Sequence, residues 1–290
     1  MTLSSGSHIH VDPGPAIHAS TAPQPKGRRN RRNKAFWWLV FLLCAFYFLV
    51  PLVATLNWSL KARPPWFGYQ SSLQDPAFAS SLFFSFVMAV VTIFASIALL
   101  LPTAYWVRLR VPRLRPIVEF ITLVPFVMPP IVLVFGLIRI YSRPPLPLTH
   151  TETGSNVLLV AGYVVLSLPY MYRAIDTGLA AIDIRTLTEA AQSLGAGWPT
   201  IVVRVILPNV RVAIVSGAFL TLAIVLGELV LAKYLARPAF GPYLSLIGQN
   251  KTFEPAAVTL ISFGLTWMAM LGIAFIGRQQ RTRVTVVGGR

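Results

Sequence analysis

The sequence has 290 residues, of which 55% are hydrophobic and only 12% are charged, and its mean hydropathy is +0.67. This composition excludes an ordinary soluble domain of the same length and favours a membrane protein. The formal net charge of +16 is carried by short basic clusters that stand between long apolar runs. A nucleic-acid groove needs basic residues on one face with interleaved aromatic rings. We therefore interpret the clusters as membrane orientation signals and expect no nucleic-acid partner.

Residues 1–34 are rich in Pro, Gly and Ser and end in a basic run, which is typical of a disordered tail. The tail is too long, and the next apolar run too extended, for a cleaved signal peptide, so the first span is expected to stay as an anchor. Residues 278–290 are expected to form a second tail. The only cysteine, Cys44, has no partner in the chain for a disulfide or a thiolate metal site.

Six apolar runs are long enough to cross a lipid bilayer as helices, which takes about 20 residues at a rise of about 1.5 Å each. We therefore expect an all-α, polytopic membrane protein whose transmembrane domain covers residues 35–277. The predicted spans are residues 35–56, 80–107, 117–138, 155–172, 212–235 and 255–277.

The basic residues are distributed unevenly between the connections of these spans. If the N-terminus is inside, the inner segments are the two tails, residues 108–115 and residues 173–211. They hold six, four, four and four Lys or Arg residues, that is 18 of the 25, while the three outer segments share seven. This asymmetry predicts a multi-pass protein of the cell membrane with both termini in the cytoplasm.

Three prolines interrupt the third predicted span, namely Pro125, Pro129 and Pro130. Each proline removes a backbone donor, so this helix should be kinked or broken, which lipid tolerates only against protein or a water-filled cavity. The prolines therefore indicate either a helix that lines a translocation pathway or a structural kink packed on a neighbour.

Two acidic residues fall inside predicted spans. Glu119 lies near the inner end of the third span and is expected to pair with the basic segment at residues 108–115. Glu228 lies in the fifth span, where an ionised carboxylate costs about 3 kcal/mol in lipid. It should therefore line the translocation pathway, or else pair with Lys233 or a neighbouring subunit.

The inner segment 173–211 has the pattern of two short helices joined by a turn. Apolar residues recur at helical spacing on its first part, at Leu179, Ile182, Leu187, Ala190, Ala191 and Leu194. Gly195 should end the first helix, because glycine can adopt the left-handed conformation of a C-terminal cap. Pro199 suits the first turn of the second helix, and Pro208 is expected to end it before the membrane.

This segment resembles the EAA loop of binding-protein-dependent ABC importer permeases of type I. The matching residues stand at the spacing of that loop: Glu189-Ala190-Ala191, Gly195, Val205 and Leu207-Pro208. The family has Ile where Val205 stands, and the change keeps a β-branched apolar residue. The place of the motif, between the fourth and fifth spans, also matches.

The resemblance implies a transport subunit and not an enzyme. In this family the EAA loop docks into a cytoplasmic ABC ATPase dimer, which binds ATP and Mg and drives the movement of the transmembrane helices. By this resemblance Glu189 would make a charged contact with the ATPase, Ala190 and Ala191 would allow close approach, and Gly195 would make the turn. Six spans are half of what the family uses. A second permease, identical or related, is therefore implied, together with an extracytoplasmic substrate-binding protein.

Residues 80–277 resemble most closely the permeases for polyamines, ferric iron and aminoethylphosphonate. The resemblance is carried by Pro125-Phe-Val-Met-Pro-Pro-Ile-Val-Leu and by Leu168-Pro169-Tyr170-Met-Tyr-Arg173. It implies import of a small polar solute, with sugar import as an alternative. A secondary carrier that works without ATP would have the same pattern of apolar spans but would not need the EAA loop. A membrane scaffold would leave the kinked third span and Glu228 unexplained.

The sequence contains no phosphate-binding loop of its own. The nearest string, Gly248-Gln-Asn-Lys-Thr252, lacks the adjacent Gly and Lys that such a loop requires. The chain also has no combination of acid, base and nucleophile, and no cluster of metal ligands. We therefore expect no catalytic residue, cofactor or metal in this chain, and ATP hydrolysis on a separate subunit.

Overall fold

The structure is a computed structural model that describes residues 31–279. The predicted tails therefore lie largely outside the described residues, although the first helix already begins at Arg31. By its contacts the chain divides into two units, Met1–Val50 and Pro51–Arg290. Helix α1 begins in the first unit and ends in the second.

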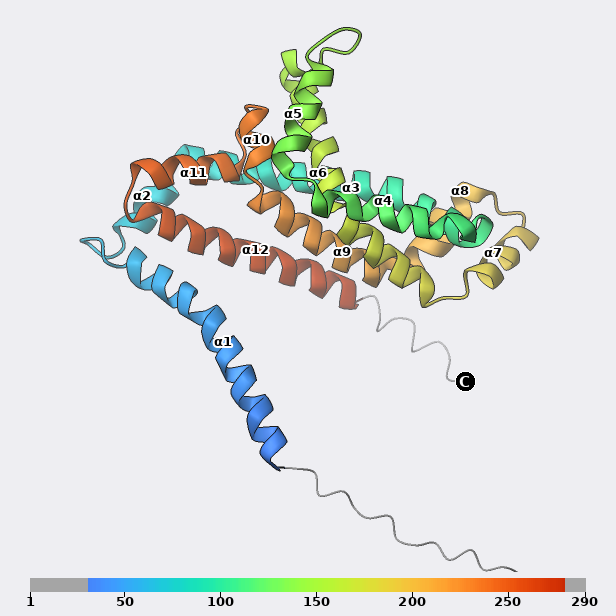
Figure 1. The fold of residues 1–290 in the computed structure, drawn as a ribbon, viewed down its shortest axis with the longest axis horizontal. Coiled ribbons are helices and arrows are strands. Elements are labelled where there is room, and N and C mark those ends of the chain that lie inside the picture. Colours follow the sequence, from blue (N-terminus) through green and yellow to red (C-terminus); the bar gives the residue numbers. More distant parts are fainter. Residues whose placement is uncertain (1–30, 280–290) are drawn as a thin grey trace, which may run out of the picture. The chain divides into compact units, whose positions relative to one another are not determined.

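Within residues 31–279 every regular element is a helix, as expected for an all-α protein (Figure 1). In chain order the elements are α1 (Arg31–Ser59), α2 (Phe67–Gln74), α3 (Pro76–Arg110), η1 (Pro112–Leu114), α4 (Arg115–Val127), α5 (Pro130–Tyr141), η2 (Leu148–His150), α6 (Glu152–Ala180), α7 (Ile184–Ser193), α8 (Trp198–Thr200), η3 (Ile201–Ile206, a π-helical turn), α9 (Leu207–Gly227), α10 (Val230–Tyr234), α11 (Phe240–Asn250) and α12 (Glu254–Gln279).

Five of the described helices are long and apolar enough to cross a membrane: Phe36–Ser59, Pro76–Arg110, Glu152–Ala180, Trp198–Gly227 and Glu254–Gly272. A sixth span is formed if the bent pair Pro112–Val127 and Pro130–Tyr141 is counted as one. The structure thus confirms a polytopic helical protein with five or six spans.

The third span is broken where the prolines predicted an interruption. Helix α4 ends at Val127, and Met128 and Pro129 have extended backbone before α5 begins at Pro130. The residue before a proline avoids helical geometry, because the proline ring clashes with it. The two halves meet at an angle of 100°, and Figure 1 shows α5 turning away from the direction of α4.

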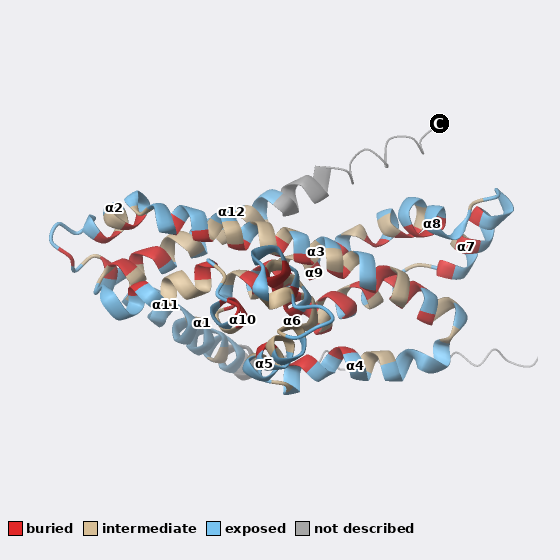
Figure 2. Ribbon diagram, turned by 90° about the horizontal axis from the view of Figure 1, so that it is seen from above, coloured by how far each residue is buried: buried red, intermediate tan, exposed pale blue. Residues whose placement is uncertain are grey.

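The core of the second unit lies between α3, α6 and α9, which pack against one another along their length. Figure 2 shows buried residues along these helices, whereas the surface of α1 is exposed. No residue in the apolar window of α1 is buried in the described structure. A helix that is apolar on all sides belongs in lipid or against another subunit.

Glycines allow the close approach of α6 and α9. A Cβ atom built on Gly217 of α9 would lie 2.8 Å from the Met171 sulfur and 3.0 Å from the Ala174 Cβ on α6. One built on Gly178 of α6 would lie 2.6 Å from the Ala213 Cβ on α9. Any larger side chain at either position would force the two helices apart.

Two predicted boundaries of the inner segment 173–211 differ from the structure. Helix α6 continues to Ala180, and the next long helix already begins at Trp198. The segment between these helices is therefore shorter than the sequence indicated. The fifth span is also displaced, because its helix ends at Gly227 and not at residue 235.

The expectation that Pro208 ends a helix is wrong. The chain stays helical from Trp198 through Pro208 to Gly227. The π-helical turn η3 precedes Pro208, which stands in the first turn of α9, where a missing N–H is tolerated. The Asn209 side chain also donates a hydrogen bond to the Val205 carbonyl at 2.7 Å and so stabilises this turn.

We predict that Gly217→Leu destabilises the protein, because leucine would overpack the contact between α6 and α9 by about 1–3 kcal/mol. Thermal unfolding of the purified chain in detergent measures the loss. Gly264→Leu is the matched control, since no heavy atom lies within 4 Å of a Cβ built at that position of α12. Equal melting temperatures for the two variants would contradict this account of the packing.

Candidate functional site

The elbow, which we define as residues 183–208, begins at a capped helix terminus. The Asp183 carboxylate accepts hydrogen bonds from the Thr186 backbone N–H at 3.1 Å and from the Thr186 hydroxyl at 2.7 Å. A carboxylate at this position satisfies a backbone donor that the first turn leaves free. The same hydrogen bonds hold the pKa of the Asp183 carboxyl below its usual range. The start of α7 is therefore firmly fixed.

Helix α7 has one face on the core and one face outward. Ile184, Thr188 and Ala191 are buried, and Ile184 and Ala191 belong to the apolar cluster formed with α3, α6 and α9. Glu189 and Ala190 are exposed on the other face. Ala191, whose implied contact with an ATPase stays a prediction, is on the buried face. Its small side chain lets α7 sit close to the protein's own helices.

The turn of the elbow is a Schellman motif centred on Gly195. This glycine has a φ of 77°, the left-handed conformation that the sequence predicted. Its N–H donates to the Gln192 carbonyl at 2.9 Å, and the Ala196 N–H donates to the Ala191 carbonyl at 3.0 Å. These are the two hydrogen bonds that define the motif, and they satisfy carbonyls at the end of α7.

A buried hydrogen bond ties the elbow to the long helix α3. The Thr188 hydroxyl donates to the Ile184 carbonyl at 2.7 Å and lies 3.1 Å from the Tyr105 hydroxyl. Because threonine has only one hydroxyl proton, Tyr105 must be the donor to Thr188. Ile201 and Val202 of η3 are buried in the same apolar cluster. The elbow is thus attached to the transmembrane helices through both of its arms.

The outer surface of the elbow is a mixture of apolar and charged side chains. Leu194 is 89% exposed and Trp198 is 48% exposed. Beside them Glu189 forms an exposed ion pair with Arg185 at 2.9 Å. Leu207 is half-buried and Pro208 is exposed, where α9 begins. Exposed large apolar residues beside charges are typical of a surface that another protein covers.

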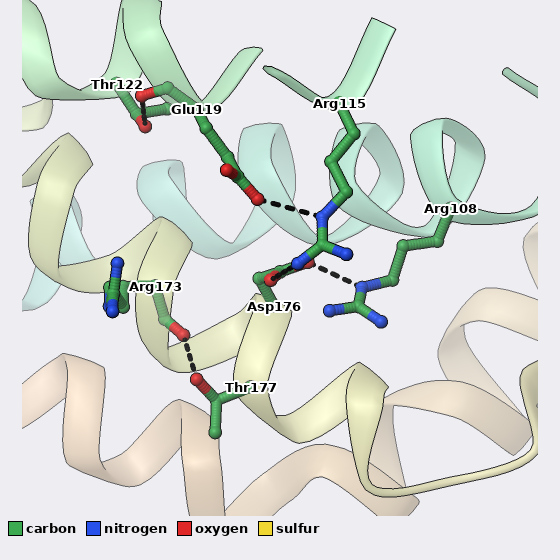
Figure 3. Close-up of polar contacts among 7 residues, drawn as sticks. All are labelled: Arg108, Arg115, Glu119, Thr122, Arg173, Asp176 and Thr177. Carbon is green, nitrogen blue, oxygen red and sulfur yellow. Dashed lines mark hydrogen bonds and ion pairs between the residues drawn. The ribbon is translucent and has the colours of Figure 1, made fainter. Parts of the chain in front are cut away.

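A cluster of charged residues lies where α3, α4 and α6 meet (Figure 3). The Asp176 carboxylate binds Arg108 at 2.5 Å and Arg115 at 3.1 Å. Arg115 also binds Glu119 at 2.8 Å, as expected from the sequence. These groups line a cavity of about 450 Å³, together with Thr122, Arg173 and Thr177. Asp176 and Arg108 were not singled out by the sequence, because their partners lie far away in the chain.

Glu228 occupies the break between α9 and α10 and is only 8% exposed. Its carboxylate accepts hydrogen bonds from the backbone N–H groups of Val230 at 2.6 Å and Leu231 at 3.0 Å, with Ala232 at 3.4 Å. Lys233 is exposed, and the expected pairing of Glu228 with it is absent. The carboxylate caps a helix turn because the chain breaks directly beside it.

The two broken spans meet each other beyond their breaks. Helix α5, which follows Pro129 and Pro130, packs against α10, which follows Glu228. The rings of Phe135 and Tyr234 lie 4.9 Å apart, centroid to centroid, at this contact. Pro125 is buried within α4, whereas Pro129 is exposed at the break. Interrupted helices inside a membrane are tolerated where they face protein or a cavity.

We predict that Tyr105→Phe loosens the elbow without unfolding the protein. The lost hydrogen bond is worth about 1 kcal/mol, so backbone amides of α7 should exchange with solvent about fivefold faster. Hydrogen–deuterium exchange measures this change. Tyr69→Phe is the control, because it removes a hydrogen bond to Ser59 of 2.7 Å near α2, at the other end of the bundle. Unchanged exchange in α7 of Tyr105→Phe would contradict the attachment.

We also predict that Glu228→Leu lowers the stability of the protein by about 2 kcal/mol, because it leaves buried N–H groups of α10 without an acceptor. Glu228→Gln retains one acceptor oxygen and should lose less. Thermal unfolding in detergent compares the variants. Lys233→Met should have the same melting temperature as the unmodified protein. A lower melting temperature for Lys233→Met would instead support an ion pair between Lys233 and Glu228.

Comparison with known proteins agrees with this arrangement. Residues 100–281 match the family model described as the inner membrane component of binding-protein-dependent transport systems. A probable molybdenum ABC transporter permease of Haloferax volcanii is 31% identical over 194 residues, which cover 62% of this chain and 70% of the relative. The spermidine/putrescine transport system permease protein PotB of Haemophilus influenzae is 26% identical over 244 residues, covering 76% and 82%.

Solved structures share the fold. A bacterial alginate ABC transporter, solved in complex with an alginate pentasaccharide-bound periplasmic protein, matches 89% of this chain and 97% of its own with a TM-score of 0.64 at 15% identity. Permeases of the matched family work with an ATPase and a substrate-binding protein. The chain belongs to the family of inner membrane components of binding-protein-dependent transport systems, and it is a multi-pass, membrane-spanning permease subunit of an ABC importer.

Proposed function

We propose that the elbow couples this permease to ATP hydrolysis on a cytoplasmic ABC ATPase dimer, which would bind ATP and Mg itself. The proposal rests on how the elbow is attached to the transmembrane helices. Its inner face is fixed on α3 and the core through Tyr105 and Ala191, while Leu194 and Trp198 are exposed outward. A partner that covers this outer face can therefore move the helices below it.

Individual roles follow from which face each residue occupies. Glu189 and Ala190 are exposed and are proposed to contact the ATPase. Gly195 would shape the turn through its left-handed backbone. Leu207 and Pro208 would connect the second arm to α9, with which they are continuous. Glu189 must exchange or extend its ion pair with Arg185 to meet a charge on the partner.

A second permease subunit, identical or related, is proposed to complete the transport unit. The apolar window of α1 supports this, because none of it is buried in the described structure and such a surface is covered by lipid or by another subunit. The pathway is proposed to pass by the broken spans, with Pro125, Pro129 and Pro130 on one side and the break at Glu228 on the other. In this proposal the capped Glu228 maintains the pathway wall, since its carboxylate is already occupied by backbone groups.

Both termini are proposed to be cytoplasmic, on the side of the elbow. Trp58, at the end of α1, donates a hydrogen bond to the Thr252 carbonyl at 3.1 Å, just before α12 begins. The end of α1 and the beginning of α12 therefore share one side, and Figure 1 shows α2 and α11 at the end of the bundle opposite α7 and α8. Arg110, at the end of α3, lines one cavity with Gln192 and Trp198 of the elbow, and a basic residue there is expected for an inner side.

The cargo is proposed to be a small polar solute, such as a polyamine, iron or a phosphonate, delivered by an extracytoplasmic binding protein. The relatives support this class, since they are named for spermidine and putrescine and for molybdenum. The family model matches residues 100–281, which include both broken spans and the elbow, and this favours import driven by ATP over an independent carrier.

The coupling is tested by Gly195→Val in the transporter reconstituted with its ATPase and binding protein. A β-branched residue at a φ of 77° is strained by about 1–3 kcal/mol. We expect the ATPase activity stimulated by the loaded binding protein, and uptake, to be largely lost, while the chain stays in the membrane.

Gly197→Val is the matched control. Gly197 has extended backbone, with φ −76° and ψ 165°, and its nearest Cβ neighbour is Pro199 at 4.0 Å. Valine is accommodated there, so stimulation should persist. Full stimulated activity in Gly195→Val, or equal losses in both variants, would refute the assigned role of the elbow.

A further inference from the structure

The charged cavity at the end of the bundle has an excess of positive charge. Three arginines and two acids line it, namely Arg108, Arg115, Arg173, Glu119 and Asp176. Arg108 and Arg115 are engaged with the two carboxylates. The Arg173 guanidinium makes no ion pair with any residue in the described part of the chain. Figure 3 shows the one dashed contact of Arg173 at its carbonyl, which accepts a hydrogen bond from the Thr177 hydroxyl. The cavity therefore offers one uncompensated cation to a ligand.

An apolar groove of about 550 Å³ adjoins this cavity. The two share four lining residues, Leu123, Pro169, Arg173 and Thr177, so they form one continuous depression. Beyond Arg173 the groove is lined by Phe126, Tyr170 and Leu220, and the first two rings pack edge to face with centroids 5.3 Å apart. Arg173 thus stands at the junction between a polar compartment and an apolar one.

The position of this junction matches the membrane interface. Arg173 directly follows the fourth apolar run, as the sequence predicted it, and lies on α6 one turn before Asp176. The basic connection between α3 and α4 lies at the same end. A basic pocket between transmembrane helices at the inner surface is suited to an anionic lipid headgroup.

We propose that this depression binds an anionic phospholipid, with its phosphate on Arg173 and an acyl chain in the groove along Phe126, Tyr170 and Leu220. Arg115 uses its Nε and one terminal nitrogen for carboxylates, and a guanidinium has five N–H donors. It can therefore give a second hydrogen bond to the phosphate. The apolar groove favours a lipid over a free oxyanion, because a free ion would leave the groove empty.

The proposal predicts a headgroup preference that the full chain in detergent can reveal. Phosphatidylglycerol and phosphatidylcholine with the same acyl chains are titrated separately, and bound lipid is counted by native mass spectrometry. Phosphatidylglycerol should bind more tightly, since a choline cation would lie against Arg173. Loss of one charge-assisted contact in Arg173→Gln should weaken phosphatidylglycerol about tenfold. Phosphatidylcholine should be weakened less, because its choline cation already opposes Arg173, so the difference between the two lipids should shrink.

Two further variants separate the headgroup from the chain. Arg113→Gln removes an exposed arginine of the same connection that does not line the cavity, and it should bind like the unmodified chain. Ser216→Trp fills the groove away from the charges and should also weaken phosphatidylglycerol.

Four outcomes would overturn the proposal. Equal binding of the two lipids would show that there is no headgroup preference. Equal effects of Arg113→Gln and Arg173→Gln would show that the preference comes from the net positive charge and not from a site at Arg173. Displacement of lipid by inorganic phosphate, with no effect of Ser216→Trp, would assign the site to a free oxyanion. If monomers bind the lipid and dimers do not, the groove is the contact surface for a second copy of the chain. None of these outcomes bears on the coupling role of the elbow, which is measured through ATP hydrolysis.

Discussion

The need to pair every backbone N–H and C=O inside a membrane governs this structure. Continuous helices meet it without help, so each place where a helix breaks needs its own partner. At the end of α9 the Glu228 carboxylate accepts the free N–H groups of α10. At the end of α4 the prolines carry no N–H that would need one. At both breaks the backbone is therefore either satisfied by a side chain or relieved of a donor, and the proposed pathway passes beside these two breaks.

Features that depend on neighbours in the chain could be predicted from the sequence. Apolar runs gave the helical, multi-pass architecture, and the prolines gave the broken third span. The left-handed Gly195 and the position of Pro199 in the first turn of a helix also followed from local chemistry. In each case the physical cause, whether burial in lipid or backbone geometry, acts over a few consecutive residues, so a single sequence contains the signal.

Features that depend on tertiary contacts were missed. Pro208 lies within a continuous helix because the π-helical turn before it accommodates the proline ring. No local sequence pattern predicted that turn. Ala191 faces the core because α7 packs on α3, a helix some eighty residues earlier in the chain. The charged cluster around Asp176 likewise joins three helices. The elbow and Glu228 could be identified from the sequence, but the contacts of their side chains depend on tertiary packing.

The continuity of the helix from Trp198 to Gly227 has a mechanical consequence. Its thirty residues, which include the π-helical turn η3, extend about 45 Å. If the elbow couples to an ATPase as proposed, this helix connects the exposed Trp198 with the far end beside Glu228. There the helix ends, and the short capped turn of α10 packs against α5. The same helix thus joins the proposed coupling surface to the proposed pathway without a loop between them.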